Sequence, residues 1–71
     1  MPFVKLNGGQ WVNANHVEMI TLSLQKTKVI IGLAGGHEHS YFEDTSPAHA
    51  TPEDWADTLA IMMTTAIEES N

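Results

Sequence analysis

The sequence contains no cysteine and no arginine, and its three strongly basic residues are Lys5, Lys26 and Lys28. Without cysteine the chain has no disulfide, no thiolate nucleophile and no thiolate ligand for zinc. Nine acidic residues against three lysines give a formal net charge of -6. A phosphate backbone would find little positive charge to bind, so we expect no direct contact with nucleic acid.

Long apolar runs are also missing. No stretch approaches the ~20 consecutive apolar residues that a helix needs to span a bilayer, and the first residues, MPFVKLNGG, lack the apolar core of a signal peptide. We therefore expect a soluble, cytoplasmic protein with no membrane partner. A chain of 71 residues accommodates one domain, residues 1–71. A domain of this size buries only about 60% of its unfolded surface, so association would add to its stability.

The residues from Thr51 onward predict an amphipathic helix over about residues 52–69. Thr51 can accept a hydrogen bond from a free N–H group at the helix N-terminus, and Pro52 suits the first helical position because its missing N–H would be unpaired there. Glu53 and Asp54 lie where the helix dipole favours negative charge. This helix is the element that we expect to cover the rest of the chain.

One face of the predicted helix is apolar and should face the core. At ~100° per residue this face comprises Trp55, Leu59, Met62, Met63 and Ala66. Ile61 falls instead among the acidic residues of the opposite side. Two interpretations of Ile61 are open: a lone exposed apolar residue, or part of a second contact surface.

Residues 3–43 predict short antiparallel strands separated by turns. Asn7 and Gly8 suit a tight hairpin, and Asn15 suits a second corner at residues 14–16. Residues 17–24 alternate as in a half-buried strand, whereas residues 28–34 are apolar on both faces. Residues 44–50 form a loop. The predicted fold is α+β: an antiparallel β-meander of four to five strands with one C-terminal helix packed on one face.

The candidate contact residues are Trp11, Ile61, Tyr41 and Glu38. Trp11 alternates with Val12, so if Val12 faces the helix, Trp11 lies on the outer face, where it could anchor a partner or stack on a flat ligand. The alternative is that Trp11 packs at the sheet edge. Acidic residues gather between Glu38 and Asp57, which suits a basic partner protein, although such clusters also occur as solvated faces.

The predicted sheet itself favours assembly. One helix covers one face, and the apolar run of residues 29–33 leaves the uncovered face apolar as well. Gly32 within this run indicates a bulge or the close approach of another element, such as the helix. We expect a homo-oligomer, with room for a small-molecule ligand between subunits.

His37 and His39 are the candidate metal ligands. They are two positions apart on a predicted strand, so their side chains share a face and could hold a divalent ion. Other ligands would have to complete the site, from among His16, His49, Glu43 and Asp44. The alternatives are solvent-facing histidines or a pH-dependent surface.

The sequence offers little for catalysis. Ser40 is the neighbour of His39, but neighbours on a strand point to opposite faces, so the two do not form a nucleophile and base. No paired carboxylates stand out. We expect no enzymatic activity, no catalytic residue and no cofactor.

Part of the chain resembles a known family. The matching residues are Leu6-Asn7-Gly8, Trp11-Val12, Asn13-Ala14-Asn15, Val17-Glu18, Ile20, Thr27, Val29-Ile30, Leu33 and Gly35-Gly36. Over roughly residues 4–36 the pattern is similar to the FlbD/SwrD family of small flagellar and swarming-motility proteins. The resemblance implies a non-enzymatic accessory protein and carries over no catalytic residue.

These observations predict a small, non-catalytic binding or regulatory accessory protein that acts through protein–protein contacts, of the motility type. One alternative is an inhibitor or small-ligand sponge of the kind carried by phages and mobile elements. Another is metal binding through the His-x-His strand.

Overall fold

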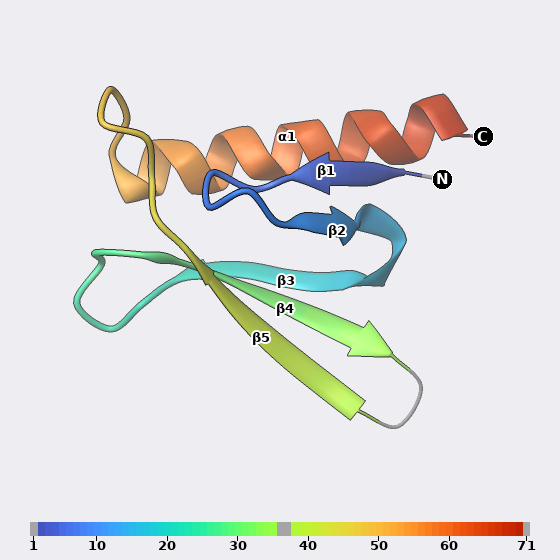
Figure 1. The fold of residues 1–71 in the computed structure, drawn as a ribbon, viewed down its shortest axis with the longest axis horizontal. Coiled ribbons are helices and arrows are strands. Elements are labelled where there is room, and N and C mark those ends of the chain that lie inside the picture. The colour runs from blue at the N-terminus through green and yellow to red at the C-terminus, as the bar shows by residue number, and fades with distance from the viewer. Residues whose placement is uncertain (1, 36–37, 71) are drawn as a thin grey trace.

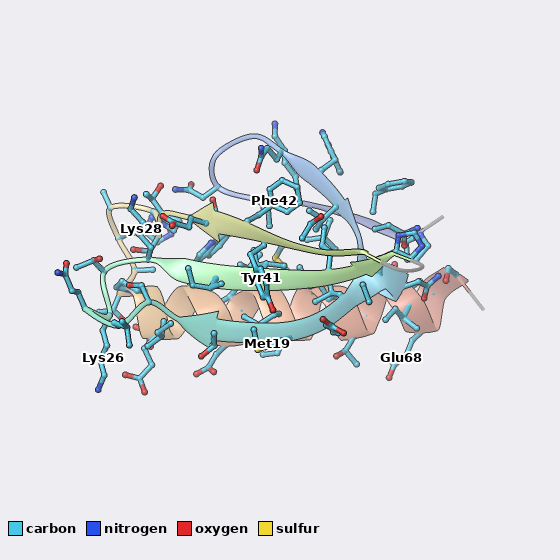
Figure 2. The ribbon with its side chains drawn as sticks, turned by 90° about the horizontal axis from the view of Figure 1, so that it is seen from below. Met19, Lys26, Lys28, Tyr41, Phe42 and Glu68 are labelled. Atoms are coloured by element: carbon cyan, nitrogen blue, oxygen red, sulfur yellow. The ribbon has the colours of Figure 1, made fainter. Side chains whose placement is uncertain are left out.

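The computed structural model describes residues 2–35 and 38–70. This part of the chain forms five strands, a short 3-10 helix and one α-helix. In order they are β1 (Phe3–Lys5), β2 (Trp11–Asn13), η1 (Ala14–His16), β3 (Val17–Leu22), β4 (Val29–Gly35), β5 (Glu38–Asp44) and α1 (Pro52–Ser70). In Figure 1 the hairpin of β1 and β2 lies next to α1, and the view from below in Figure 2 shows the larger sheet in front of α1 with the hairpin to one side, so α1 contacts both. The predicted α+β fold with a C-terminal helix is confirmed.

The strands form two antiparallel sheets rather than one continuous meander. One sheet pairs β1 with β2, and the other has the order β3-β4-β5. The division falls at η1, where the Asn13 side chain accepts a 3.0 Å hydrogen bond from the Asn15 N–H. Ala14 N–H donates to the Pro2 carbonyl at 2.8 Å. The corner expected at residues 14–16 is therefore a 3-10 turn that leads the chain out of one sheet and into the other.

The first hairpin forms where the asparagine and glycines indicate a turn. Leu6 N–H donates to the Gln10 carbonyl at 2.7 Å, and Gly9 N–H donates to the Leu6 carbonyl at 3.0 Å. Gly9 has a φ of 95°, a conformation that a residue with a Cβ adopts only at a cost. The hairpin places Val4 opposite Val12 on its buried side.

The core lies where α1 meets both sheets. Its fully buried side chains are Val29, Ile31 and Leu59. The helix contacts β1, η1, β3 and β4, so it joins the hairpin to the larger sheet. Leu59 and Met63 are buried as the apolar helix face predicted, and Trp55 is only half-buried. Leu59, rather than Trp55, is therefore the helix residue that fills the centre of the core.

The helix begins as its first residues predict. The Thr51 hydroxyl accepts a hydrogen bond from the Asp54 N–H at 3.1 Å, and the Thr51 carbonyl accepts one from the Trp55 N–H at 2.9 Å. Pro52 is the first helical residue. This geometry is that of a threonine N-cap followed by proline.

In the described part of the chain, no helix covers the face of the larger sheet away from α1, and Figure 2 looks onto this face. Met19 and Tyr41 flank Gly32 in the ladder. A Cβ on Gly32 would lie 3.3 Å from Tyr41 Cε1 and 3.4 Å from Met19 Cε. The close approach expected at Gly32 thus comes from side chains of the neighbouring strands on the outer face, and not from the helix.

Candidate binding surface

Three large apolar side chains remain exposed and meet along one groove between the β1–β2 hairpin and α1. Phe3, Trp11 and Ile61 are 46%, 63% and 67% exposed. They line a hollow of about 380 Å³ together with Lys5, Thr65 and Glu69, among others. We call this feature the hairpin–helix groove. Val4 and Val12 face the core from the same two strands, so their neighbours Phe3 and Trp11 must point the other way.

The Trp11 ring lies close to the side chain of its strand partner, Lys5. Lys5 pairs with Trp11 across the hairpin, and the Lys5 ammonium lies 5.9 Å from the centroid of the indole ring. Such a cation–π contact contributes about 0.5–1 kcal/mol at an exposed site. Val12 is buried and Trp11 is mostly exposed, so the two neighbouring side chains point in opposite directions, and the Trp11 ring lies beside α1 in the groove.

Ile61 is not an isolated apolar residue. It lines the hairpin–helix groove and also lines a smaller hollow of about 250 Å³ with Ala60, Thr64 and Thr65. The structure therefore places Ile61 and Trp11, which are far apart in the sequence, on one continuous surface. This arrangement supports the interpretation of Ile61 as part of a contact surface.

One acidic residue, Glu69, lines the groove together with Ile61 and Thr65. Asp57 is also exposed on α1, but it is not among the lining residues. At ~100° per residue, Asp57 and Glu69 lie about 120° apart around the helix, so Asp57 belongs to a different side of α1.

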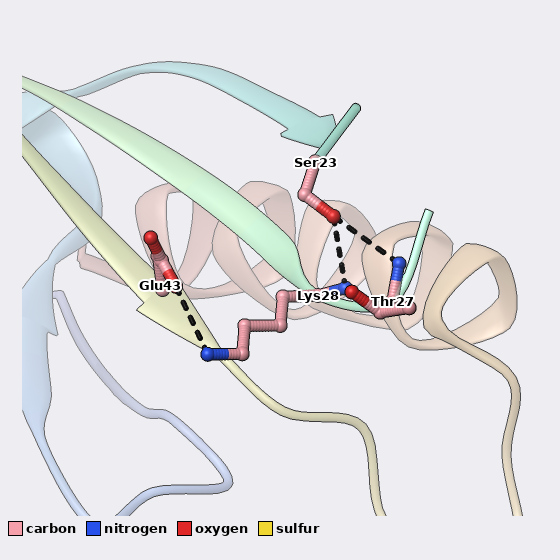
Figure 3. A network of polar contacts seen from close by, with 4 residues as sticks. All are labelled: Ser23, Thr27, Lys28 and Glu43. Carbon is pink, nitrogen blue, oxygen red and sulfur yellow. Dashed lines mark hydrogen bonds and ion pairs between the residues drawn. The ribbon is translucent and has the colours of Figure 1, made fainter. Parts of the chain in front are cut away.

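The turn between β3 and β4 uses its polar groups for its own structure (Figure 3). The Ser23 hydroxyl accepts hydrogen bonds from the N–H groups of Thr27 and Lys28 at 3.1 and 3.2 Å. Lys28 Nζ lies 3.2 Å from a Glu43 carboxylate oxygen. A wide hollow of about 570 Å³ lies here, beside the fully exposed Leu24. Because these polar groups already have partners, the hollow is a weaker candidate site than the groove.

A buried carboxylate fixes the position of the hairpin against the helix. Asp44 is 2% exposed. Its Oδ1 accepts a hydrogen bond from the Gly8 N–H at 2.8 Å, and its Oδ2 accepts from the Asn7 N–H at 2.9 Å and from Trp55 Nε1–H at 2.6 Å. Asp44 thus joins the first turn, the end of β5 and the start of α1. The sequence carries no signal for this contact, and it predicts Asp44 only as the first residue of a loop and as a possible metal ligand.

Tyr41, a third candidate residue, does not line the groove. Tyr41 is 62% exposed and lies on the outer face of the larger sheet (Figure 2). Glu38 belongs to β5, and its side chain lies outside what the structure describes. The groove therefore brings together two of the four predicted contact residues, Trp11 and Ile61, and adds Phe3, which was expected only as a strand residue.

The predicted metal pair cannot be placed in space, because His37 lies outside the described residues and His39 is described only as a position in β5. His16 and His49 are exposed. Over residues 2–35 and 38–70, no three His, Cys, Asp or Glu side chains lie close enough to share a metal ion. Metal binding through His37 and His39 stays a prediction from the sequence.

Within the same residues, α1 lacks the apolar length that crossing a membrane requires. Comparison with family models, with characterised proteins and with solved structures finds no match to this chain. The similarity to the FlbD/SwrD family therefore remains a prediction based on the residues quoted for it.

Proposed function

We propose that this protein is a small, non-catalytic accessory protein that regulates a partner protein by binding it at the hairpin–helix groove. The observation that carries the proposal is the convergence of Phe3, Trp11 and Ile61, from three different elements, on one exposed surface. Exposed apolar patches of this kind are typical of interaction sites, and tryptophan is enriched among the residues that dominate binding energy.

The energetics of these side chains support the proposal. Fully burying an isoleucine or phenylalanine side chain contributes about 1.5–3 kcal/mol. Ile61 and Trp11 are both more than 60% exposed, so most of that contribution is not realised in the fold of the isolated chain. A partner that covers the groove would realise it on binding.

The resemblance to the FlbD/SwrD family supports a motility-type partner. The main alternative is an inhibitor or small-ligand sponge of the phage or mobile-element kind. The feature that this alternative would use is the exposed indole ring of Trp11 in the groove. In that case the ligand would stack on Trp11.

A homo-oligomer is a further part of the proposal, and the outer face of the larger sheet is the surface that suits it. Met19 and Tyr41 are 41% and 62% exposed there. Because no helix within residues 2–35 and 38–70 covers this face, a second copy would shield both residues at once. Native mass spectrometry of wild type and Tyr41→Asp tests this part: assembly that is lost in the variant supports it, and a wild-type monomer contradicts it.

The experiment that tests the groove is quantitative affinity purification from the cells in which the protein occurs. The baits are wild type, Trp11→Ser and Leu24→Ser. Leu24 is fully exposed and lies away from the groove, so its replacement controls for the loss of an exposed apolar side chain. We expect one protein to be enriched by wild type and by Leu24→Ser but lost from Trp11→Ser. Equal recovery by all three baits would contradict the assignment of the groove.

A further inference from the structure

We infer that Asn7 is a site of spontaneous deamidation, and that the Asp44 carboxylate suppresses the reaction while the first hairpin stays packed against the end of β5. Asn7 is followed by Gly8, and none of the other asparagines, at positions 13, 15 and 71, precedes a glycine. Because glycine has no Cβ, its backbone nitrogen is easily reached by the preceding side chain. This chemistry belongs to the turn itself and is independent of the proposed partner.

The reaction is internal to the turn and needs water as its only reactant. The Gly8 nitrogen gives its proton to solvent and attacks the side-chain carbon Cγ of Asn7, so that an N–Cγ bond forms. The Cγ–Nδ2 bond then breaks, and Nδ2 leaves as ammonia with a proton from water. Water hydrolyses either carbonyl of the resulting succinimide ring, which gives aspartate or isoaspartate at position 7. Both residues of the turn are exposed, so water reaches them.

Asp44 holds the attacking nitrogen in the folded protein. The Gly8 N–H donates to Asp44 Oδ1 at 2.8 Å, and this bond must break before the nitrogen can attack. The adjacent carboxylate also disfavours the negative charge that the nitrogen develops when it loses its proton. The Asn7 N–H donates to the other oxygen, Oδ2, at 2.9 Å. Asp44 therefore fixes the peptide groups on both sides of Asn7.

The side chain of Asn7 is held as well. Its Nδ2 donates to the Thr45 carbonyl at 2.7 Å and lies 3.5 Å from the Thr45 hydroxyl. The attacking nitrogen and the leaving group are thus both bound to the segment at the end of β5. The turn has to separate from this segment before the reaction can occur. Local openings of this kind take place in folded proteins without global unfolding.

The products cannot restore the contact. An aspartate at position 7 has no side-chain N–H for the Thr45 carbonyl, so that two acceptor oxygens face each other. It also adds a second negative charge to a turn that already binds the Asp44 carboxylate. Isoaspartate lengthens the main chain before Gly8 by one carbon, so the two N–H groups no longer match the two Asp44 oxygens. Deamidation therefore loosens the turn irreversibly.

Incubation of the purified full chain at mildly alkaline pH, followed by peptide mapping with mass spectrometry, measures the reaction. The reference is the synthetic peptide VKLNGGQ, residues 4–10, which has the same local sequence without the fold. We expect Asn7 to react about 100-fold more slowly in the folded chain than in the peptide, because two charge-assisted hydrogen bonds must open first. Asn13 and Asn15 are internal controls and should stay unmodified.

Asp44→Asn should accelerate the reaction about tenfold, because the Gly8 N–H loses its acceptor. This variant is also less stable overall, so wild type is measured in the urea concentration that lowers its free energy of unfolding to that of the variant, with the peptide in the same urea as reference. A local opening exposes little surface, so urea should accelerate the wild-type reaction much less than Asp44→Asn does.

Gly8→Ala tests the chemistry of the attack, and it should slow the reaction in the chain and in the peptide alike. The fold accommodates this alanine, because Gly9 and not Gly8 has the positive φ and an added Cβ would lie 3.4 Å from Asp44 Oδ1. Asn7→Asp tests the consequence and should lower the melting temperature by about 5 °C. Asn15→Asp makes the same change in charge at an exposed position and should lower the melting temperature by less than about 2 °C.

Equal rates at Asn7 in the folded chain and in the peptide would overturn the inference, and so would a peptide that does not react. A rate in Asp44→Asn equal to or below that of wild type would show that Asp44 does not suppress the reaction. If wild type in the matching urea reacts as fast as Asp44→Asn, global unfolding sets the rate and the protective role of the contact is refuted. An unchanged melting temperature of Asn7→Asp would refute the irreversible loosening.

Discussion

The replacement Asp44→Asn tests how the hairpin is held against the helix. The two Asp44 oxygens accept hydrogen bonds from the Asn7 N–H, the Gly8 N–H and Trp55 Nε1–H. An asparagine has nearly the same shape but one acceptor oxygen instead of two. At best its oxygen takes the place of Oδ2 and keeps two bonds, and its NH₂ group then faces the Gly8 N–H, donor against donor.

The magnitude follows from these contacts. A hydrogen bond to a charged group contributes about 1.5–3 kcal/mol, against about 0.5–1.5 kcal/mol for a neutral pair. The variant loses one charge-assisted bond and weakens two others, but it also removes the cost of burying a charge. We expect a net loss of about 2 kcal/mol. Domains of this length unfold with about 4–10 kcal/mol, so the melting temperature should fall by about 10 °C.

Urea unfolding followed by tryptophan fluorescence measures this loss, and the shift of the Trp55 indole proton in NMR reports the contact itself. Asp57→Asn is the matched control, because Asp57 is exposed and its replacement should change stability by less than about 0.5 kcal/mol. In a double-mutant cycle, the decrease in the free energy of unfolding caused by Trp55→Phe should be about 1 kcal/mol smaller in the Asp44→Asn background than in wild type. A stability for Asp44→Asn within about 0.5 kcal/mol of wild type would refute the reasoning.

Three further variants test other parts of the fold by the same unfolding assay. Leu59→Ala should lower the free energy of unfolding by about 3 kcal/mol, because Leu59 is fully buried where α1 meets the sheets and its truncation leaves a cavity. A decrease of less than about 1 kcal/mol would contradict the position of the core. Thr51→Ala should cost about 1 kcal/mol through loss of the N-cap bond to the Asp54 N–H, whereas Thr51→Ser should restore it. Lys28→Gln should change the free energy of unfolding by less than about 0.5 kcal/mol, because the ion pair of Lys28 with Glu43 is about half exposed. A larger effect would contradict the expectation that an exposed ion pair contributes little to stability.

The start of α1 could be predicted from the sequence because its signals are local. Thr51 and Pro52 act on backbone groups within one turn of themselves, so no knowledge of the rest of the fold is needed. The outward position of Trp11 was predictable for a similar reason, since alternation along a strand separates it from Val12. Ile61 fell outside the apolar face by helical spacing alone.

The meeting of Trp11 and Ile61 could not be predicted in the same way. It depends on the side of α1 against which the hairpin packs, and that choice is made by tertiary contacts. Asp44 is the clearest of these contacts: it lies 37 positions from Asn7 in the sequence. A single aspartate at the end of a strand belongs to no periodic pattern that would indicate such a partner.

Hydrogen bonds between side chains and nearby backbone groups also make the strands differ from the expected ones. Residues 17–24 alternate as one strand would, but β3 ends at Leu22. The Ser23 hydroxyl accepts the N–H groups of Thr27 and Lys28, so Ser23 belongs to the turn and Leu24 is left fully exposed. At residues 14–16, the Asn13 side chain similarly stabilises a 3-10 turn and divides the expected meander into two sheets.

Site-specific photocrosslinking tests the central claim, that a partner protein binds at the hairpin–helix groove, most directly. A photoreactive phenylalanine analogue replaces Ile61 in one variant and Leu24 in another, and both are irradiated in the cells in which the protein occurs. Both side chains are highly exposed, so they differ in location and not in access. We expect one discrete crosslinked protein from position 61 and none from position 24. Crosslinking that is equal at the two positions, or absent from position 61, would contradict the claim.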